Sequence, residues 1–280
     1  MTVRKPSVAG TFYPEDPKKL KGMIQDLLNQ ESESIDYSLA SCPILGGVVP
    51  HAGYMYSGYQ AVHFYEILRY SKVQVDTVII LNPNHTGFGE GEVSLPGCDQ
   101  WETPLGMVSI DQEFAAKLNY PSSSMAHLQE HSAEVQLPFL QVFLEQGFKV
   151  LPISMNQQTP ESAGKLARAI VETNRDLKRK LLVIASSDFS HYVKPEEGMK
   201  LDHLVVDAIL HLDTKRVYRE VRKHRISVCG YGPIMALMEY ALMCSDHPRV
   251  KVLRQGNSGD ISPSDSVVDY FSMLFYQEKG

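Results

Sequence analysis

Residues 44–54 read ILGGVVPHAGY, an apolar run that ends in a proline, a histidine and a glycine. Strands of a sheet that is covered on both faces are apolar throughout, so residues 44–50 are predicted to form a buried strand. His51 follows at the carboxyl end of that strand. In open α/β sheets, ligands gather at this end, because the loops there carry side chains inward. The stretch therefore predicts a fold class and places one residue where a site is expected.

Three more runs rich in β-branched residues resemble residues 44–50, and helix-like segments lie between them. Strand and helix alternate, which is the pattern that a mostly parallel sheet requires. We therefore predict a single α/β domain over residues 1–280, with a mostly parallel central sheet flanked by helices. The other predicted strands are 75–81, 149–155 and 181–185, and the predicted helices are 57–70, 133–146 and 160–174, with an opening helix after Asp16 and Pro17.

The remaining segments complete this domain, since no internal repeat or low-complexity linker marks a boundary. Residues 92–95 (EVSL) and 105–110 (LGMVSI) flank Trp101 and Pro104, and they are predicted to form a hairpin or an excursion at the sheet edge. Beyond Pro195, helices are expected as far as residue 221 and over 233–243, and closing strands over 249–253 and 266–275.

Bulk composition restricts the class of protein. With 43% hydrophobic and 21% charged residues, the chain has ordinary globular values, which disfavour a disordered or fibrous chain. The net charge of −6 disfavours a nucleic-acid partner, because such binding relies on a concentrated basic face. No apolar run approaches the roughly 18 residues of a membrane span, and no signal-peptide stretch follows the start. We therefore predict a cytoplasmic protein with no membrane partner.

Two histidines stand at the ends of neighbouring predicted strands. His51 lies in PHAGY and His85 lies in NPNH. Imidazole is the commonest protein ligand for zinc, copper and iron, and two histidines from adjacent strand ends can converge on one ion. Each histidine alone is equally well explained as a strand-end residue that bonds the backbone. Together, they favour a functional site.

Cys229 is distinguished from the other cysteines by its setting, SVCGYGP, just before the predicted helix 233–243. A thiol near a helix N-terminus can have a lowered pKa, and the thiolate is both a nucleophile and a soft metal ligand. An isolated cysteine is more often a small buried hydrophobic residue, which describes Cys42, Cys98 and Cys244. The wide spacing of the four cysteines predicts neither a CxxC metal ribbon nor a disulfide framework.

Asp188 and His191 stand three residues apart in SSDFSHY. On a tight turn this spacing puts a carboxylate and an imidazole on one side, where they can move protons or orient a ligand. The alternative is a helix N-cap beside an exposed histidine, and the motif alone favours that alternative.

His131 opens HSAEVQLPFL, with Glu130 before it and Glu134 one turn later. The group can be a base and its orienting carboxylate. A helix start with acidic residues favoured by the helix dipole explains both glutamates equally well. The chain contains no GxGxxG, HExxH or GxSxG motif to support a nucleotide-binding, zincin or hydrolase function.

Taken in order, these motifs resemble one family. SVAGTFYP, PHAGYMYSG, NPNH, WETPLG, EHSAEVQLPFL, SSDFSHY and VCGYGP occur in the order found in the Memo family, and the resemblance covers nearly the whole chain. The fold of that family is similar to that of class III extradiol ring-cleaving dioxygenases, which hold non-haem iron(II) with two histidines and a carboxylate. The resemblance implies that His51 and His85 are metal ligands and that Cys229 is the third ligand, with His131, Asp188 and His191 beside them as candidate catalytic residues.

The expected cofactor is a divalent metal, with iron first and copper or zinc as alternatives. A cysteine in place of the carboxylate softens the site and alters iron's potential, so ring cleavage is doubtful. The first hypothesis is a metal-dependent redox enzyme that acts on a small molecule in a cleft at the strand ends. The second is a non-catalytic adaptor that binds a peptide or metabolite in the same cleft, as animal Memo proteins are described to do. A third is a metal-free protein whose histidines hold loops. The sequence does not predict the oligomeric state.

Overall fold

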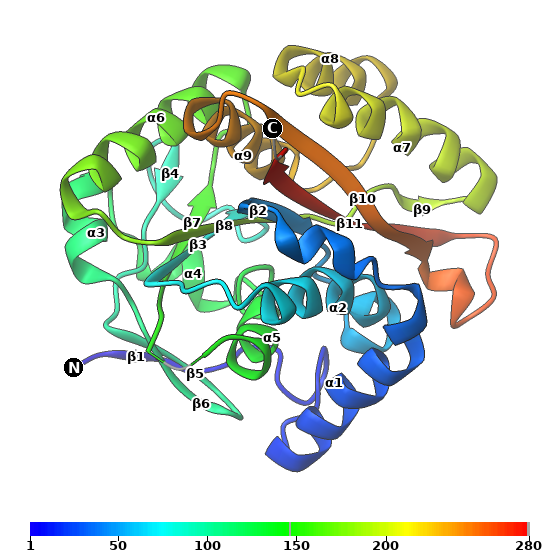
Figure 1. The fold of residues 1–280 in the computed structure, drawn as a ribbon, viewed down its shortest axis with the longest axis horizontal. Coiled ribbons are helices and arrows are strands. Elements are labelled where there is room, and N and C mark those ends of the chain that lie inside the picture. Colours follow the sequence, from blue (N-terminus) through cyan, green and yellow to red (C-terminus); the bar gives the residue numbers. More distant parts are fainter. Residues whose placement is uncertain (146, 279–280) are drawn as a thin grey trace.

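A mixed sheet runs through the centre of the computed structural model, which describes residues 1–145 and 147–278 (Figure 1). Its four central strands are parallel neighbours in the order β2, β8, β3 and β7. They have the bounds Ile44–Val49 (β2), Leu181–Ser186 (β8), Thr77–Pro83 (β3) and Lys149–Met155 (β7). These are the four strands that the apolar runs predict, and all four are confirmed.

Two strands outside this centre, β11 and β4, run antiparallel to it, so the prediction of a mostly parallel sheet is wrong. β11 (Val267–Gln277) pairs antiparallel with β2, and β10 (Pro248–Asn257) pairs antiparallel with β11. β4 (Val93–Ser94) pairs antiparallel with β7 at the other edge. For β11, the reason is its connection to β10, which runs in the same direction as the central strands; this connection contains no long helix. A parallel neighbour needs a long crossover, whereas a short connection returns the chain antiparallel.

The predicted edge excursion divides into two parts. β5 (Gln100–Thr103) and β6 (Gly106–Ser109) form an antiparallel hairpin, and β1 (Val3–Arg4) joins β5 in parallel to make a small second sheet. Residues 92–95 do not pair with this hairpin, because they supply β4 of the main sheet. The hairpin is therefore confirmed around Pro104, with a different partner strand from the one expected.

Helices cover both faces of the sheet, and two adjacent glycines of β2 show how closely. A Cβ atom added to Gly46 would lie 2.8 Å from Leu237 Cδ1 of α9 (Tyr231–Cys244). One added to Gly47 would lie 2.2 Å from Phe64 Cε2 of α2 (Tyr54–Ser71). Consecutive strand residues point to opposite faces, so α9 and α2 pack on opposite sides of β2. Only glycine leaves room for both helices.

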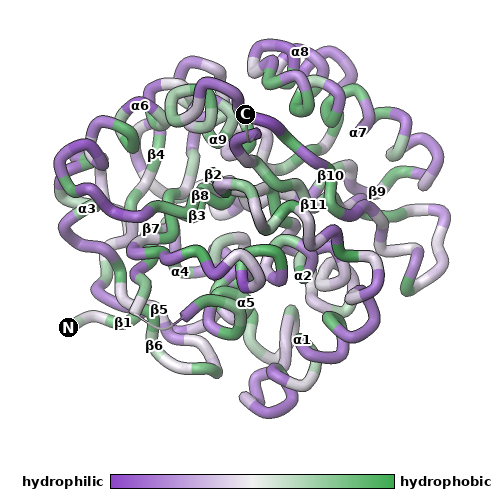
Figure 2. Tube along the Cα trace, in the orientation of Figure 1, coloured by the Kyte–Doolittle hydropathy of each residue, from purple (hydrophilic) through white to green (hydrophobic). Residues whose placement is uncertain are grey.

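The other helices complete the layers around this core. Asp16 caps the first helix, as predicted, by accepting from the amides of Lys18 at 3.0 Å and Lys19 at 2.9 Å. Figure 2 shows mostly hydrophobic colours at the central strands, while outer helices such as α1, α6 and α8 alternate polar and apolar residues. Among the described residues, none of the helices is long and apolar enough to cross a membrane. The helices are α1 (Pro17–Glu31), α3 (Gln112–Leu118), α4 (Ser124–Leu128), α5 (Gln136–Phe143), α6 (Pro160–Leu177), α7 (Pro195–Leu210) and α8 (Thr214–His224).

The helix predicted over 133–146 is the one whose bounds differ most. α5 begins at Gln136, because residues 132–135 form turns, and it ends at Phe143. Gln146, the expected last residue, lies outside the described residues. The irregular stretch before α5 matters for the site, because Glu130 contacts His85 after β3 and the Ser132 carbonyl accepts from Ser186 at the end of β8.

Candidate functional site

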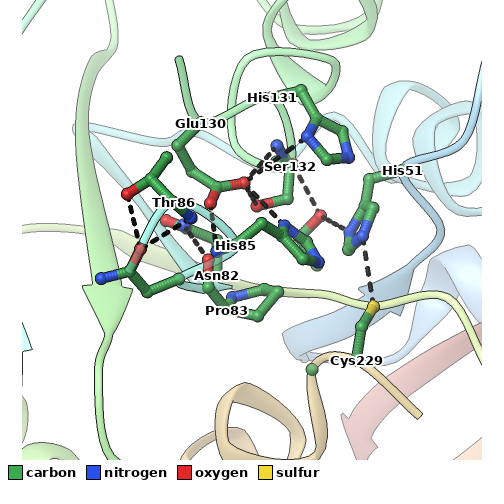
Figure 3. A network of polar contacts seen from close by, with 12 residues as sticks. His51, Asn82, Pro83, His85, Thr86, Glu130, His131, Ser132 and Cys229 are labelled. Atoms are coloured by element: carbon green, nitrogen blue, oxygen red, sulfur yellow. Dashed lines mark hydrogen bonds and ion pairs between the residues drawn. The ribbon is translucent and has the colours of Figure 1, made fainter. Parts of the chain in front are cut away.

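The structure brings His51, His85 and Cys229 to one point. His51 follows β2, His85 follows β3, and Cys229 precedes α9. One ligand atom from each of these residues lies within 4.8 Å of the other two, and Figure 3 shows the three side chains pointing toward one another. Cys229 Sγ lies 3.2 Å from His51 Nε2. Residues that are far apart in the sequence therefore form one group with two nitrogen donors and one sulfur donor.

The buried His51 side chain is held in a single tautomer by Ser186. The Ser186 hydroxyl donates to the Ser132 carbonyl at 2.7 Å and accepts from Gln136 Nε2 at 2.8 Å. Because its one proton is already used, His51 Nδ1, at 3.0 Å, must donate to it. Nε2 then carries the lone pair that faces Cys229. Burial lowers the pKa of His51 well below its usual range, and the charges of His131 and His85 act in the same direction.

His85 is oriented by a buried carboxylate. Glu130 is 0% exposed, and it accepts from the His85 amide at 2.7 Å and from His85 Nδ1 at 2.9 Å. Burial alone would raise the pKa of Glu130, but the bond and charge of His85 and the bonds from Ser132 outweigh it and hold the pKa at about 2. An ionised carboxylate on Nδ1 leaves Nε2 of His85 free, which is the arrangement commonly seen behind metal-binding histidines.

Neither imidazole bonds the backbone in the described structure, so the strand-end alternative does not describe these two histidines. A second group of His85, Glu130 and His131 also has the spacing of metal ligands. Glu130 Oε1, however, already accepts from His85 Nδ1 and from both the amide and the hydroxyl of Ser132. We therefore assign Glu130 to the orientation of His85. The sequence had associated it with His131.

The pKa of the Cys229 thiol is raised, whereas the sequence predicts a lowered one. Burial raises its pKa, and the carboxylate of Asp188 raises it further. These effects prevail although α9 begins at Tyr231, only two residues after Cys229. The sulfur accepts from the Asp188 amide at 3.2 Å and lies 3.5 Å from the Asp188 carbonyl. Ionisation of this thiol would therefore need a positive charge beside it, such as that of a bound metal ion.

Asp188 lies beside His51, at the end of β8. Its Oδ1 accepts from the His51 amide at 2.7 Å, and its Oδ2 lies 4.0 Å from His51 Nε2. Burial raises the pKa of Asp188 to about 6, against the lowering effects of the His51 amide and of the charges of His191 and His85. The helix-cap alternative for SSDFSHY is wrong, since the motif enters β9 (His191–Val193) and Asp188 bonds His51.

His131 lies against both histidines, whereas the direct contacts of His191 are with another loop. The His131 ring stacks on His85 at 4.9 Å between centroids and meets the edge of His51 at 5.3 Å. His191 Nδ1 lies 2.8 Å from the Ser227 carbonyl, and its amide donates to the Ser227 hydroxyl at 2.7 Å. His191 therefore ties the loop of Asp188 to the loop of Cys229.

The dipole alternative for Glu130 and Glu134 is also wrong, because α5 has no acidic residue in its first turn.

Between Asp188 and His191, Ser190 is anchored by a pair of buried acids that the sequence did not reveal. The Ser190 hydroxyl donates to Asp202 Oδ1 of α7 at 2.7 Å. Asp269 of β11 lies next to Asp202, and neither of its oxygens accepts a hydrogen bond from the described residues. Gly198 lets α7 pass over this carboxyl, since a Cβ there would lie 2.2 Å from Asp269 Oδ2. Burial raises the pKa of Asp269 to about 8, and the charge of Asp202 contributes in the same direction.

Asp269→Asn is expected to make the chain more stable, by an amount that grows with pH. Between about pH 4 and pH 8, the folded wild type holds a proton on Asp269 that the unfolded chain releases, so wild-type stability falls as pH rises. Asparagine stays neutral throughout. The advantage of the variant should grow by up to about 1.4 kcal/mol per pH unit in this window. Urea unfolding from pH 4 to pH 9 measures it. The exposed Asp265→Asn is the control, and an equal pH profile for the two variants would contradict the assignment.

Comparisons with known proteins agree with this arrangement of motifs. The family described as Memo-like protein matches residues 4–274. A MEMO1 family protein of Saccharolobus solfataricus is 41% identical, covering 97% of this chain and 99% of that protein, and one of Archaeoglobus fulgidus is 39% identical, covering 98% and 99%. A crystal structure of an uncharacterized protein from Escherichia coli K12 has a TM-score of 0.44 and 11% identity, covering 76% of this chain and 91% of that one. The family match and the two relatives span nearly the full length, and the chain belongs to the Memo-like protein family.

Proposed function

We propose that this chain is a metalloprotein that holds one metal ion between His51, His85 and Cys229 and uses it in redox chemistry on a small molecule. The observation that carries the proposal is the convergence of these three donor atoms within 4.8 Å. The Nδ1 atoms of both histidines are engaged by Ser186 and Glu130, which leaves both Nε2 atoms free as donors. The donor set therefore fits a transition metal.

The sulfur ligand and the family resemblance favour different metals. Imidazole suits iron, copper and zinc alike, while a thiolate favours copper(I) and zinc more than a carboxylate would. Iron remains the first expectation from the resemblance to the dioxygenases. Any of these ions would supply the positive charge that the Cys229 thiol needs in order to ionise, and would act as a Lewis acid or electron carrier when bound.

Access and proton transfer support a catalytic role. Three protein ligands leave coordination positions for a substrate, as catalytic metal sites do. The side chains of His85 and His131 are 34% and 24% exposed, so a small molecule can approach from their side. Asp188, with its pKa near 6, and His131 are the candidates for moving a proton at a bound molecule. His191 is the third candidate, positioned by Ser227.

The second candidate function is a binding protein that takes up a peptide or metabolite at the same residues without turnover. The observation in its favour is Cys229, which replaces the carboxylate of the ring-cleaving ligand set. The same substitution argues against ring cleavage, because a thiolate changes iron's potential and is itself sensitive to oxygen.

Metal titration tests the proposal. Protein purified without chelator or oxygen would be stripped and titrated separately with iron(II), copper(I) and zinc(II). We expect saturation at one equivalent, and we expect the iron-loaded chain to consume oxygen with a suitable small-molecule reductant. Saturable binding without oxygen consumption would favour the binding protein, and no saturable binding of any of the three ions would contradict both the metal site and the redox function.

A further inference from the structure

Two buried charges next to the site, Arg4 and Glu134, have no part in the function proposed above. Both side chains are almost fully buried, and Arg4 Nη1 lies 2.7 Å from Glu134 Oε2. Replacing a buried ion pair with apolar residues is often neutral or stabilising, so stability alone is a weak reason for such a pair. We therefore asked which segments of the chain Arg4 and Glu134 hold in position.

Glu134 holds the N-terminal segment, residues 4–13. Its carboxylate accepts from the amides of Ser7 at 2.9 Å and Val8 at 3.0 Å, and from the hydroxyl of Tyr13 at 2.7 Å. The ring of Phe12, in the same segment, lies 4.9 Å from the ring of His131. Burial alone would raise the pKa of Glu134, but the charge of Arg4 and these bonds outweigh it, so the carboxylate is ionised. Glu134 therefore ties the segment that carries Phe12 to the side of the site.

Arg4 holds the backbone of the loop that orients the histidines. Its Nη2 donates to the Glu130 carbonyl at 2.8 Å, and its Nε donates to the His127 carbonyl at 2.6 Å. The guanidinium also lies 4.1 Å over the ring of Trp101, which fixes its plane. Arg4 therefore acts on His85 through Glu130: it binds the Glu130 carbonyl, and the Glu130 side chain binds His85.

The segment 130–136 serves both histidine ligands. Glu130 orients His85, and the Ser132 carbonyl and Gln136 together fix the Ser186 hydroxyl that orients His51. Figure 3 shows Glu130, His131 and Ser132 on one side of the three converging side chains. A shift in this short loop would disturb both imidazoles at once, because no regular helix holds it before Gln136.

We propose that docking of the N-terminal segment and binding of the metal are coupled, with Arg4 and Glu134 as the positioning residues that connect them. The inference rests on the proposed metal site. When the segment is docked, Arg4 and Glu134 hold segment 130–136 in the form that orients His51 and His85. By linkage, a bound metal must then stabilise the docked segment by the same factor by which docking raises metal affinity.

Glu134→Gln is the direct test, because it keeps the side-chain shape and removes the charge. Changes to groups that orient metal ligands typically cost 10- to 100-fold in affinity, so we expect metal affinity to fall about tenfold. Hydrogen exchange gives a second readout. In the wild type, metal should slow exchange at the amides of Ser7 and Val8, which donate to Glu134. In the variant, that protection should be lost.

Glu31→Gln is the matched control. Glu31 is also buried and accepts from His63 at 2.8 Å and Arg254 at 2.9 Å, and its partners are not those of the metal site. It should change stability without changing metal affinity. Should Glu134→Gln not fold, Tyr13→Phe removes only the 2.7 Å bond to Glu134 and should lower affinity in the same direction.

The outcomes separate this inference from the proposed function. If the wild-type chain binds no metal, the proposed function fails and the coupling fails with it. If the wild type binds metal and its affinity is unchanged in Glu134→Gln, or in Tyr13→Phe where the former does not fold, only the coupling is overturned. Exchange at Ser7 and Val8 that is the same with and without metal would overturn it as well.

Discussion

Replacing Cys229 with alanine is expected to lower metal affinity by more than about a hundredfold. Loss of a group that merely orients a ligand costs 10- to 100-fold, and Cys229 is one of three donors itself. The remaining pair, His51 and His85, is a weaker and more open set. Equilibrium dialysis with zinc(II) or iron(II) measures the effect directly. The control is Cys244→Ala, at the exposed end of α9, which should bind metal like the wild type.

Cys229→Asp sharpens this prediction, because it builds the carboxylate ligand set in the same fold. We expect it to regain part of the iron(II) affinity lost in Cys229→Ala and to lose preference for copper(I), since oxygen donors suit harder ions. If Cys229→Ala binds as tightly as Cys244→Ala, the sulfur is not a ligand. In that case the raised pKa of the thiol would mark an ordinary buried cysteine.

Gly46→Ala is expected to destabilise the chain by about 3 kcal/mol or more. The added Cβ would lie 2.1 Å from the Val183 carbonyl oxygen of β8 and 2.8 Å from Leu237 of α9. The first contact is with the backbone of a central strand, so relief requires β2 to move away from β8. His51 follows β2 directly, so metal affinity should fall together with stability.

Gly164→Ala is the matched control for this substitution. Gly164 lies inside α6, with nothing within 4 Å of an added Cβ, so alanine there should stabilise the chain by up to about 1 kcal/mol. Urea unfolding of both variants measures the difference. Equal stability of the two variants would show that β2 is not packed as closely between its neighbours as the structure places it.

The strands were predictable, and their directions were not. Runs such as residues 149–155 are apolar and β-branched throughout, which identifies a buried strand without reference to the rest of the chain. Direction depends on which strands become neighbours. The pattern of residues 266–275 is the same whether that strand is parallel or antiparallel to β2. The antiparallel direction of β11 therefore follows from its short connection to β10, whose geometry the sequence pattern does not contain.

The three proposed ligands were predictable, but the groups that orient them were not. His51, His85 and Cys229 stand at loop positions with a recognisable residue type. Glu130 is visible in the sequence, yet its hydrogen-bond partner is His85, 45 residues away, while the Nδ1 of the adjacent His131 lies farther from it, at 3.8 Å. The tautomer of His51 depends on a chain of hydrogen bonds through Ser186, which exists only once three separate segments have packed together.

For the Cys229 thiol, the local sequence predicts a pKa shift in the wrong direction. The sequence placed Cys229 near a helix start, which favours a lowered pKa. In the structure the helix does begin close by, at Tyr231, but the carboxylate of Asp188 also lies nearby and the sulfur is largely enclosed. Both effects oppose ionisation, and neither can be read from the residues around Cys229.

X-ray absorption at the metal edge of the reconstituted chain tests the central claim most directly, because it identifies the donor atoms bound to the ion. We expect two imidazole nitrogens and one sulfur, with the sulfur lost in Cys229→Ala and one nitrogen lost in His51→Ala. A spectrum with no sulfur in the wild type, or one that is the same in all three proteins, would contradict it.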